Sequence, residues 1–323
     1  WEKSKTPPRL LFLLLFLFYF MNTGSDWARP ADKRFMTMPR QFIQGTTYFI
    51  TRRCTQRQFW LKPTSLNIDI FGFCLAVAAK KFGLSVHAVC VMSNHYHMIV
   101  TDPENRVAEF YGWLHKYVAK AINASCGRLE NLWSSEKTSV IPLRSEKDVL
   151  DKTVYTLANP VQAHLVALGK NWPGIWLFQP GKQQVFNRPD VYFSDDGDMP
   201  KKATLTIAKS PQSSAQNDAE YVEQIETLLF LREQKIVAKM NECGESFLGI
   251  RGVLDQTQSA SPKNQEPRQE ITPRVAAKDK WLRIGSILRN KGFLSEYAKA
   301  RQRWKSGDKD VEFPLGSYAL RIH

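Results

Sequence analysis

Two histidines separated by one residue are the first candidates for chemistry in this chain. His95 and His97 flank Tyr96 in the run SNHYHMI. Because side chains alternate in direction along a strand, residues two apart point to the same face, where two imidazoles could share one metal ion. The spacing alone also fits an ordinary pair of strand histidines, so other residues must decide. If an ion is bound, at least one further ligand has to come from elsewhere in the chain.

The elements around this pair follow a recognisable order. A run rich in β-branched and aromatic residues predicts a first strand. Apolar residues that recur every three or four positions predict two helices. A turn at Ser93 and Asn94 predicts a hairpin. The order β-α-β-β-α-β predicts an α+β, ferredoxin-like fold. We expect strands at Gln41–Arg52, Ser85–Val91, His95–Thr101 and Thr138–Leu143, and helices at Pro63–Phe82 and from Val107 to near Gly127.

Beyond these elements the chain is predicted to carry helical additions and a basic C-terminal extension. Two further helices are expected at about Glu146–Ala158 and Pro160–Leu168. We divide the chain into a core domain at 36–200, a linker with an amphipathic helix at 201–255, a disordered linker at 256–273 and the extension at 274–323. Residues 311–323 resemble a strand that returns to the folded unit.

Residues 1–35 are left out of the fold prediction. The chain opens at Trp1 and runs through twelve consecutive apolar residues from Leu10 to Met21, fewer than the roughly 20 that span a bilayer. We favour sequence from upstream of a natural start at Met36 or Met38. An export or anchor signal and a buried helix are the alternatives.

The charge of the chain favours a polyanionic partner. Its 45 Lys and Arg exceed its 31 Asp and Glu, which gives a formal charge of +14 and a pI near 9.5. Such an excess favours nucleic acid, because cations neutralise phosphates and release counterions. The five cysteines never form a C-x-x-C pair, so we expect neither a disulfide framework nor a zinc knuckle, and a cytoplasmic setting. No Walker A sequence suggests a nucleotide cofactor.

Four segments together resemble a known family. HAVCVMSNHYHMIV, KYVAKAIN, Leu132-Trp133-Ser134 and VYTLANPVQAHLV occur in this order. They resemble the REP-associated tyrosine transposases, relatives of the insertion-sequence transposases of the HUH nuclease superfamily. The resemblance covers roughly residues 36–200. Tyr96 is a departure, since relatives usually carry an aliphatic residue between the histidines, and its hydroxyl would lie close to a bound metal.

The resemblance implies roles for three residues, and helical spacing adds a fourth. His95 and His97 would be metal ligands, and Tyr155, just before an Asn-Pro step, would be the nucleophile. Asn159 lies four residues after Tyr155, so on one helix both side chains share a face and the amide oxygen could be the third ligand. Asn159 could equally cap a second helix that begins at Pro160. Tyr111 and Tyr117 are rival nucleophiles, although their apolar stripe favours packing.

The same resemblance implies a reaction and a partner. A divalent ion, Mg²⁺ or Mn²⁺, would assist attack of Tyr155 on a phosphodiester of single-stranded DNA beside a hairpin, leaving a 5′-phosphotyrosine and a free 3′-hydroxyl. We expect a monomer or homodimer and no membrane. The alternatives are a non-catalytic nucleic-acid-binding protein on the same scaffold and a metallohydrolase that activates water.

Two basic regions are candidates for holding the DNA. Arg52 and Arg53 follow the first strand, where they could contact phosphates or simply be a solvated strand end. The tail from Lys278 to Lys305 carries nine Lys or Arg against two acids, interleaved with aromatic residues. It could contact phosphates and stack on bases, or it could be an amphipathic helix with a solvent-exposed basic face. The tail candidates are Lys278, Lys280, Arg283, Arg289 and Lys291.

Overall fold

The core of the protein is the predicted β-α-β-β-α-β unit. The structure, a computed structural model, describes residues 39–193, 197–263 and 275–317. Residues 1–35, with the apolar run 10–21 and the predictions made for them, lie outside this part. Within it, no helix has the length and apolar character needed to cross a membrane. The core elements are β1 (Thr46–Arg53), α2 (Ser65–Phe82), β2 (Ser85–Val91), β3 (His95–Asp102), α3 (Val107–Ser125) and β4 (Ser139–Leu143).

The strands form one antiparallel sheet in the order β4-β1-β3-β2-β5, in which β5 is the short strand Trp176–Leu177. The first four strands have the ferredoxin-like order, so the fold prediction is confirmed. Local signals explain the boundaries. The Thr64 side chain caps α2 by accepting from the Asn67 N–H, and Gly83 ends the helix at φ +68°, a left-handed conformation that glycine adopts without a side-chain clash.

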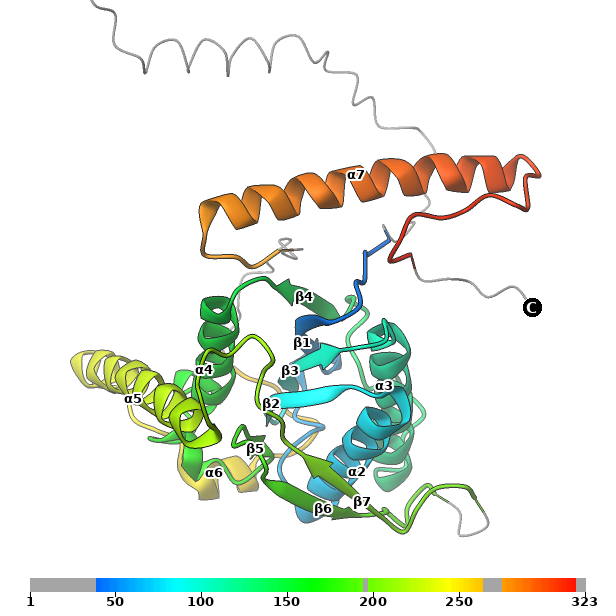
Figure 1. Ribbon diagram of the computed structural model, residues 1–323. Coiled ribbons are helices and arrows are strands. Elements are labelled where there is room, and N and C mark those ends of the chain that lie inside the picture. The colour runs from blue at the N-terminus through cyan, green and yellow to red at the C-terminus, as the bar shows by residue number, and fades with distance from the viewer. Residues whose placement is uncertain (1–38, 194–196, 264–274, 318–323) are drawn as a thin grey trace, which may run out of the picture. The chain divides into compact units, whose positions relative to one another are not determined.

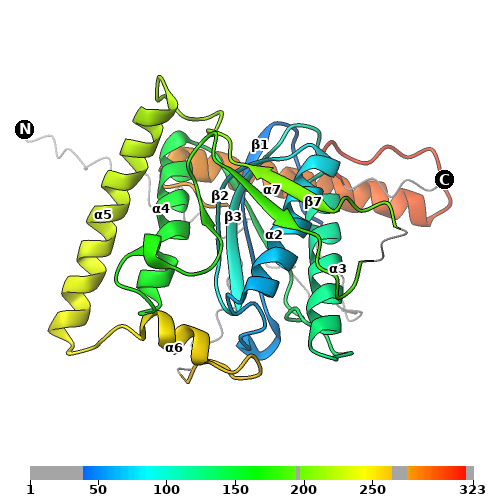
Figure 2. The ribbon, with the colours of Figure 1, turned by 90° about the horizontal axis from the view of Figure 1, so that it is seen from below.

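Different helices cover the two faces of the sheet. Because neighbouring residues alternate, Tyr48, Tyr96 and Met98 face α2 and α3 in the largest hydrophobic cluster. Phe49 and Ile99 face the opposite side, in a second cluster. There α4 (Glu146–Gln162) packs on the sheet, with α5 (Asp218–Glu242) against α4. Figures 1 and 2 show the resulting layers of α5, α4, sheet, and then α2 with α3.

The continuous helix α4 corrects one prediction. No second helix forms at Pro160–Leu168, because α4 runs through Pro160 and ends at Gln162. Proline lacks an N–H and its ring crowds the carbonyl four residues earlier, which disrupts a helix interior. Here only the last turn of α4 follows it. Asn159 is therefore inside a helix and does not cap one.

Several later segments also differ from their predictions. Residues 201–206 are not a linker, because β7 (Lys202–Thr206) pairs with β6 (Gln183–Asn187) and contacts α2. The described end of the predicted disordered linker is bonded to the core, since the Phe59 N–H donates to Ala260 O at 3.0 Å. The remaining elements are the 3₁₀ turns η1 (Thr55–Arg57) and η2 (Gly169–Asn171), and the helices α6 (Gly249–Asp255) and α7 (Lys280–Lys305).

The described part of the closing segment, residues 311–317, forms no strand. It does return to the folded unit as predicted. The Phe42 N–H donates to Gly316 O at 3.0 Å, and Gln41 Nε2 donates to Leu315 O at the same distance. Gly316 has φ +85°, and a Cβ there would lie 2.3 Å from Phe42 O, so only glycine allows this approach.

A buried histidine lies on the α4 face of the sheet. His87 is 1% exposed, at a register shift between β2 and β3. Its Nε2 is 2.6 Å from Thr101 Oγ1 and its Nδ1 is 2.9 Å from Ala208 O. Burial lowers the pKa of His87 to about 4. With both nitrogens bonded inside the protein, His87 is structural and does not contact phosphate.

We predict that His87 makes the fold sensitive to mild acid. The folded pKa of about 4 lies below the ordinary value of 6.5, so the unfolded chain takes up the proton first and the stability is lost as pH falls. Because of this difference in pKa, the free energy of unfolding should fall by about 2 kcal/mol between pH 7 and pH 5. In urea unfolding over this pH range, the free energy of unfolding should decrease by about 2 kcal/mol less in His87→Gln than in the wild type. An equal loss in both proteins would contradict the assignment.

Candidate active site

The two histidines of β3 lie side by side on the face that α4 covers. Their ring centroids are 4.8 Å apart and the ring planes are 85° apart. Antiparallel pairing with β1 places Arg53 opposite His95 and Thr51 opposite His97. His97 is 5% exposed, whereas His95 is only partly buried, so the pair lies at the edge of the covered surface.

Neighbouring side chains set the protonation of both rings. His95 Nδ1 is 2.6 Å from Asn94 Oδ1, and because an amide oxygen only accepts, Nδ1 must donate. His97 Nδ1 is 2.8 Å from Thr51 Oγ1. His97 Nε2 is buried and has no hydrogen-bond partner among the described residues. A histidine whose Nδ1–H is bonded and whose Nε2 lone pair is free has the form that binds metals.

Burial keeps both imidazoles neutral near pH 7. It lowers the pKa of His95 to about 4, with Arg53 adding to the effect, and it lowers the pKa of His97 well below the usual value. Asn159 opposes this shift at both rings. The Asn159 side chain is therefore close to both imidazoles, and its Nδ2 donates to Tyr155 O at 2.8 Å.

These three groups fit a divalent ion. Two neutral imidazoles and one amide oxygen are suitable ligands when waters or phosphate oxygens complete the shell. The described residues contain no cluster of three or more His, Cys, Asp or Glu that could bind a metal, whereas the Asn159 amide could serve as a third protein donor beside the two imidazoles. The helical spacing of Tyr155 and Asn159, predicted from sequence, is what brings this amide to the histidines.

Tyr155 lies directly beside the histidines. Its ring centroid is 5.3 Å from that of His97 with the planes 81° apart, and it is 5.9 Å from Phe49. The side chain is half-buried in the cluster between sheet and α4. One ring edge thus packs in the core, while the site around it remains partly open.

Two cations flank the Tyr155 ring. Lys152 Nζ is 5.2 Å from the ring centroid, and the Arg232 guanidinium carbon is 5.3 Å from it. Sequence analysis missed both residues. Lys152 precedes Tyr155 by three residues, so helical spacing was a usable signal. Arg232 belongs to α5, which we had placed outside the core domain.

The packing of α5 fixes the position of Arg232. Tyr221, Ile225 and Leu229 are buried in the same hydrophobic cluster as Phe49. Next to Arg232, the buried Glu233 carboxylate accepts the Gly169 N–H at 2.8 Å, and burial raises the pKa of this carboxyl. The helix that carries Arg232 is therefore an integral wall of the site.

The other tyrosines singled out from the sequence, Tyr96, Tyr111 and Tyr117, lie on the opposite face of the sheet. Tyr96 is fully buried in the α2 and α3 cluster, and its hydroxyl is 2.5 Å from His115 Nε2. Our expectation that the Tyr96 hydroxyl lies near the metal is therefore wrong, because adjacent strand residues face opposite ways. Tyr111 and Tyr117 pack against that same cluster. Tyr155 is the candidate nucleophile that lies with the histidines.

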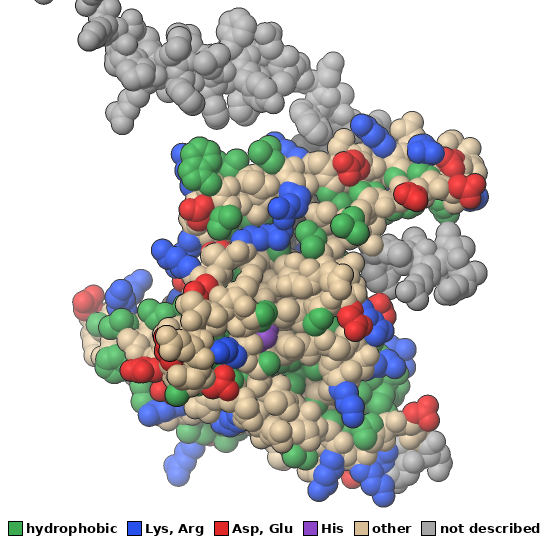
Figure 3. Space-filling view, in the orientation of Figure 1, with side chains coloured by type: hydrophobic (Ala, Val, Ile, Leu, Met, Phe, Trp, Pro, Cys, Tyr) green, Lys and Arg blue, Asp and Glu red, His purple; other side chains and the backbone are tan. Residues whose placement is uncertain are grey.

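The predicted DNA-contacting residues have different surroundings. Arg52 points away from the histidines, donates to Thr138 Oγ1 at 2.5 Å and lies over the Trp133 ring. Arg53 is exposed beside His95. Lys278 pairs with Asp151 at 2.5 Å, which joins the tail to α4. Lys280, Arg283, Arg289 and Lys291 are exposed on α7. Figure 3 shows cations, acids and apolar side chains mixed along that helix.

One family model matches the part of the chain that carries both histidines. Residues 44–139, which include both histidines but not Tyr155, match the family model described as "Transposase IS200 like". This part of the chain is therefore similar to the IS200-like transposases.

Solved structures give weaker similarities. A REP-associated tyrosine transposase bound to a REP hairpin is 21% identical with a TM-score of 0.37, over 43% of this chain and 81% of that one. A protein from Deinococcus radiodurans R1, described as a "putative transposase", is 20% identical with a TM-score of 0.28, over 37% of this chain and 95% of that one. No curated protein sequence matches the chain.

We predict that Thr51 tunes metal affinity through His97. Thr51→Val keeps the side-chain volume but removes the partner of His97 Nδ1, so Mn²⁺ affinity measured by calorimetry should fall about 10- to 100-fold. Thr47→Val is the matched control, because Thr47 lies on the same strand and bonds Thr101 at 2.8 Å instead. Equal Mn²⁺ affinity in Thr51→Val and wild type would argue against His97 as a ligand.

Proposed function

We propose that this chain is a metal-dependent single-stranded DNA endonuclease and strand transferase of the REP-associated tyrosine type. The observation that supports this best is the meeting of four groups on one sheet face. His95 and His97 are held neutral, the Asn159 side chain is close to both, and the Tyr155 ring lies 5.3 Å from that of His97. The sequence resemblance implies the roles of His95, His97 and Tyr155, and helical spacing adds Asn159.

The reaction follows from the chemistry of these groups. A divalent ion bound by the two imidazoles and the Asn159 oxygen would polarise a non-bridging phosphate oxygen. The Tyr155 oxygen attacks the phosphorus and loses its proton to solvent. The bond from phosphorus to the 3′-oxygen breaks, and that oxygen takes up a proton. The products are a 5′-phosphotyrosine and a free 3′-hydroxyl, which can reverse the step on the same or another strand.

The surroundings of Tyr155 suit a phosphate-bearing substrate. Lys152 and Arg232 place two positive charges beside the ring. A groove of about 1070 Å³ between α4 and α5 is lined by cations that include Arg232, Lys235 and Lys239, by the carboxylates of Glu146, Asp151 and Glu245, and by apolar residues such as Leu228. The cations of this groove could contact backbone phosphates of single-stranded DNA. The hairpin beside the cleaved site is the partner that the family resemblance implies.

Tyr155→Phe is the direct test. Wild-type protein mixed with labelled single-stranded hairpin DNA and Mn²⁺ should give a protein-DNA adduct that survives denaturation, and Tyr155→Phe should give none. Tyr111→Phe and Tyr117→Phe, on the other face of the sheet, should retain the adduct. An adduct that persists in Tyr155→Phe would contradict the proposal.

The same experiment separates the two alternatives. Cleavage that continues in Tyr155→Phe without an adduct would indicate a hydrolase that activates water. Binding without any cleavage by the wild type would indicate a non-catalytic DNA-binding protein.

Arg232 should contribute to the chemical step. Its guanidinium can hold the phosphate that Tyr155 attacks, so Arg232→Gln should lower single-turnover cleavage at saturating DNA about tenfold or more. Arg232→Lys should recover part of this loss because the charge remains. Lys235→Gln, one turn along α5 in the same groove, should leave the saturated rate unchanged. If both glutamine variants behave alike, Arg232 has no special role.

A further inference from the structure

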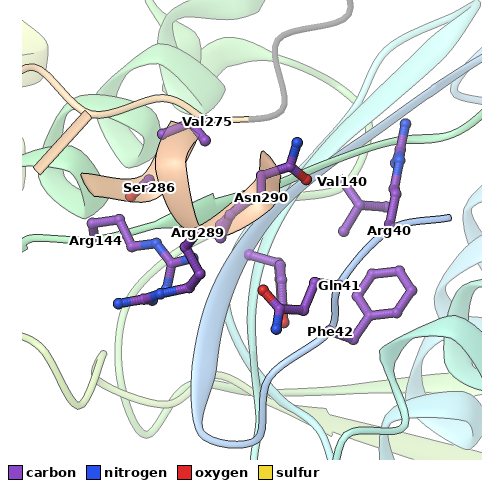
Figure 4. A pocket seen from close by; sticks show the side chains of 11 residues that line it. Arg40, Gln41, Phe42, Val140, Arg144, Val275, Ser286, Arg289 and Asn290 are labelled. Carbon is purple, nitrogen blue, oxygen red and sulfur yellow. The ribbon is translucent and has the colours of Figure 1, made fainter. Parts of the chain in front are cut away.

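A second cationic site lies at the other end of the sheet. Arg144 directly follows β4, and with Arg289 of α7 it lines a small cavity of about 40 Å³. Figure 4 shows the side chains of Arg144 and Arg289 close to each other, from the two sides of this cavity. Ser286 and Asn290 of α7 line it as well, and both carry groups that can donate hydrogen bonds.

The two guanidiniums have no negative partner among the described residues. Neither forms a salt bridge with a described carboxylate, and the buried Arg144 Nε lacks a hydrogen-bond partner. Burial lowers the pKa of Arg144, and the positive charge of Arg289 lowers it further. Two other tail cations do have acidic partners, Lys278 with Asp151 and Arg303 with Asp308. Like charges brought together in this way leave a position suited to an anion.

We propose that Arg144 and Arg289 form a phosphate-binding site for the backbone of the bound DNA. Arginine presents donors in a planar fork that matches two phosphate oxygens, and two such forks can grip one phosphate from both sides. The Ser286 hydroxyl and the Asn290 amide add uncharged donors. That the phosphate belongs to DNA rests on the proposed function; the anion site itself does not.

This site positions DNA and takes no part in cleavage. The cavity is also lined by Tyr48 and Val140, which belong to the face opposite the histidines. Tyr48 of β1 pairs with Pro142 of β4. Thr51, three residues further along β1, pairs with His97 of β3. The phosphate held here is therefore a different one from the phosphate that Tyr155 attacks, and DNA that reaches both passes the edge strand β4.

The salt dependence of DNA binding tests the site. Each phosphate contact contributes about 0.7 to 0.9 to the slope of log affinity against log salt. Arg289→Gln, in full-length protein with fluorescent hairpin DNA over a KCl series, should reduce that slope by about this amount. Single-turnover cleavage at saturating DNA should be unchanged. Lys80→Gln removes the same charge from an exposed position on α2 and should leave the slope unaltered; an unaltered slope in Arg289→Gln would overturn the proposal.

Stability measurements test the anion site without DNA. Removing one of two unneutralised like charges should raise the thermal midpoint of Arg289→Gln in dilute chloride by about 1 to 2 °C. Inorganic phosphate should stabilise the wild type more than Arg289→Gln at equal ionic strength. A lower midpoint in chloride, or equal stabilisation by phosphate in both proteins, would count against the site. Absence of any DNA binding by the wild type, with these two results intact, would instead refute the proposed function.

Discussion

The alternation of side chains along β3, fixed by its register with β1, is the constraint on which the site depends. Because His95 pairs with Arg53 and His97 with Thr51, both imidazoles face α4, and the intervening Tyr96 is turned into the opposite core. A slip of one residue would bury the imidazoles among α2 and α3 and expose Tyr96. The hydrophobic sorting of Tyr48 and Met98 to one face and of Phe49 and Ile99 to the other holds the register. The same packing that stabilises the sheet therefore fixes where the chemistry occurs.

The second requirement is a helix that presents a phenol and an amide together. Tyr155 and Asn159 lie one turn apart on α4, whose buried side packs on Phe49 and Ile99. The Asn159 amide group donates back to the Tyr155 carbonyl, and its side chain is close to both histidines. Packing of α5 then places Arg232 over the phenol. The site thus combines the matched family domain with helices that follow it in the chain.

Much of this arrangement was predictable from sequence because it depends on local periodicity. Strands β2 and β4, helix α2 and the hairpin before His95 fall within a few residues of their predicted bounds, since apolar spacing and turn residues specify them. The break expected at Pro160 was wrong, because a proline near the end of a helix disturbs few hydrogen bonds. Arg232 and the pairing of β6 with β7 depend on contacts between residues distant in sequence, which periodicity does not encode. Arg289 was a candidate from sequence, but its proximity to Arg144 depends on the packing of α7 near the end of β4, which the sequence pattern does not encode.

One consequence concerns stoichiometry. His95, His97, Asn159 and Tyr155 meet within a single copy of the chain, through the direct contact of α4 with β2 and β3. Ser145, the one residue between Arg144 and α4, caps that helix, so the connection after β4 has little slack with which to exchange α4 between neighbours. Under the proposed function, each molecule would therefore carry these four groups itself and would not need a tyrosine from a neighbouring copy. A second molecule would be required only to bring a second DNA end into reach.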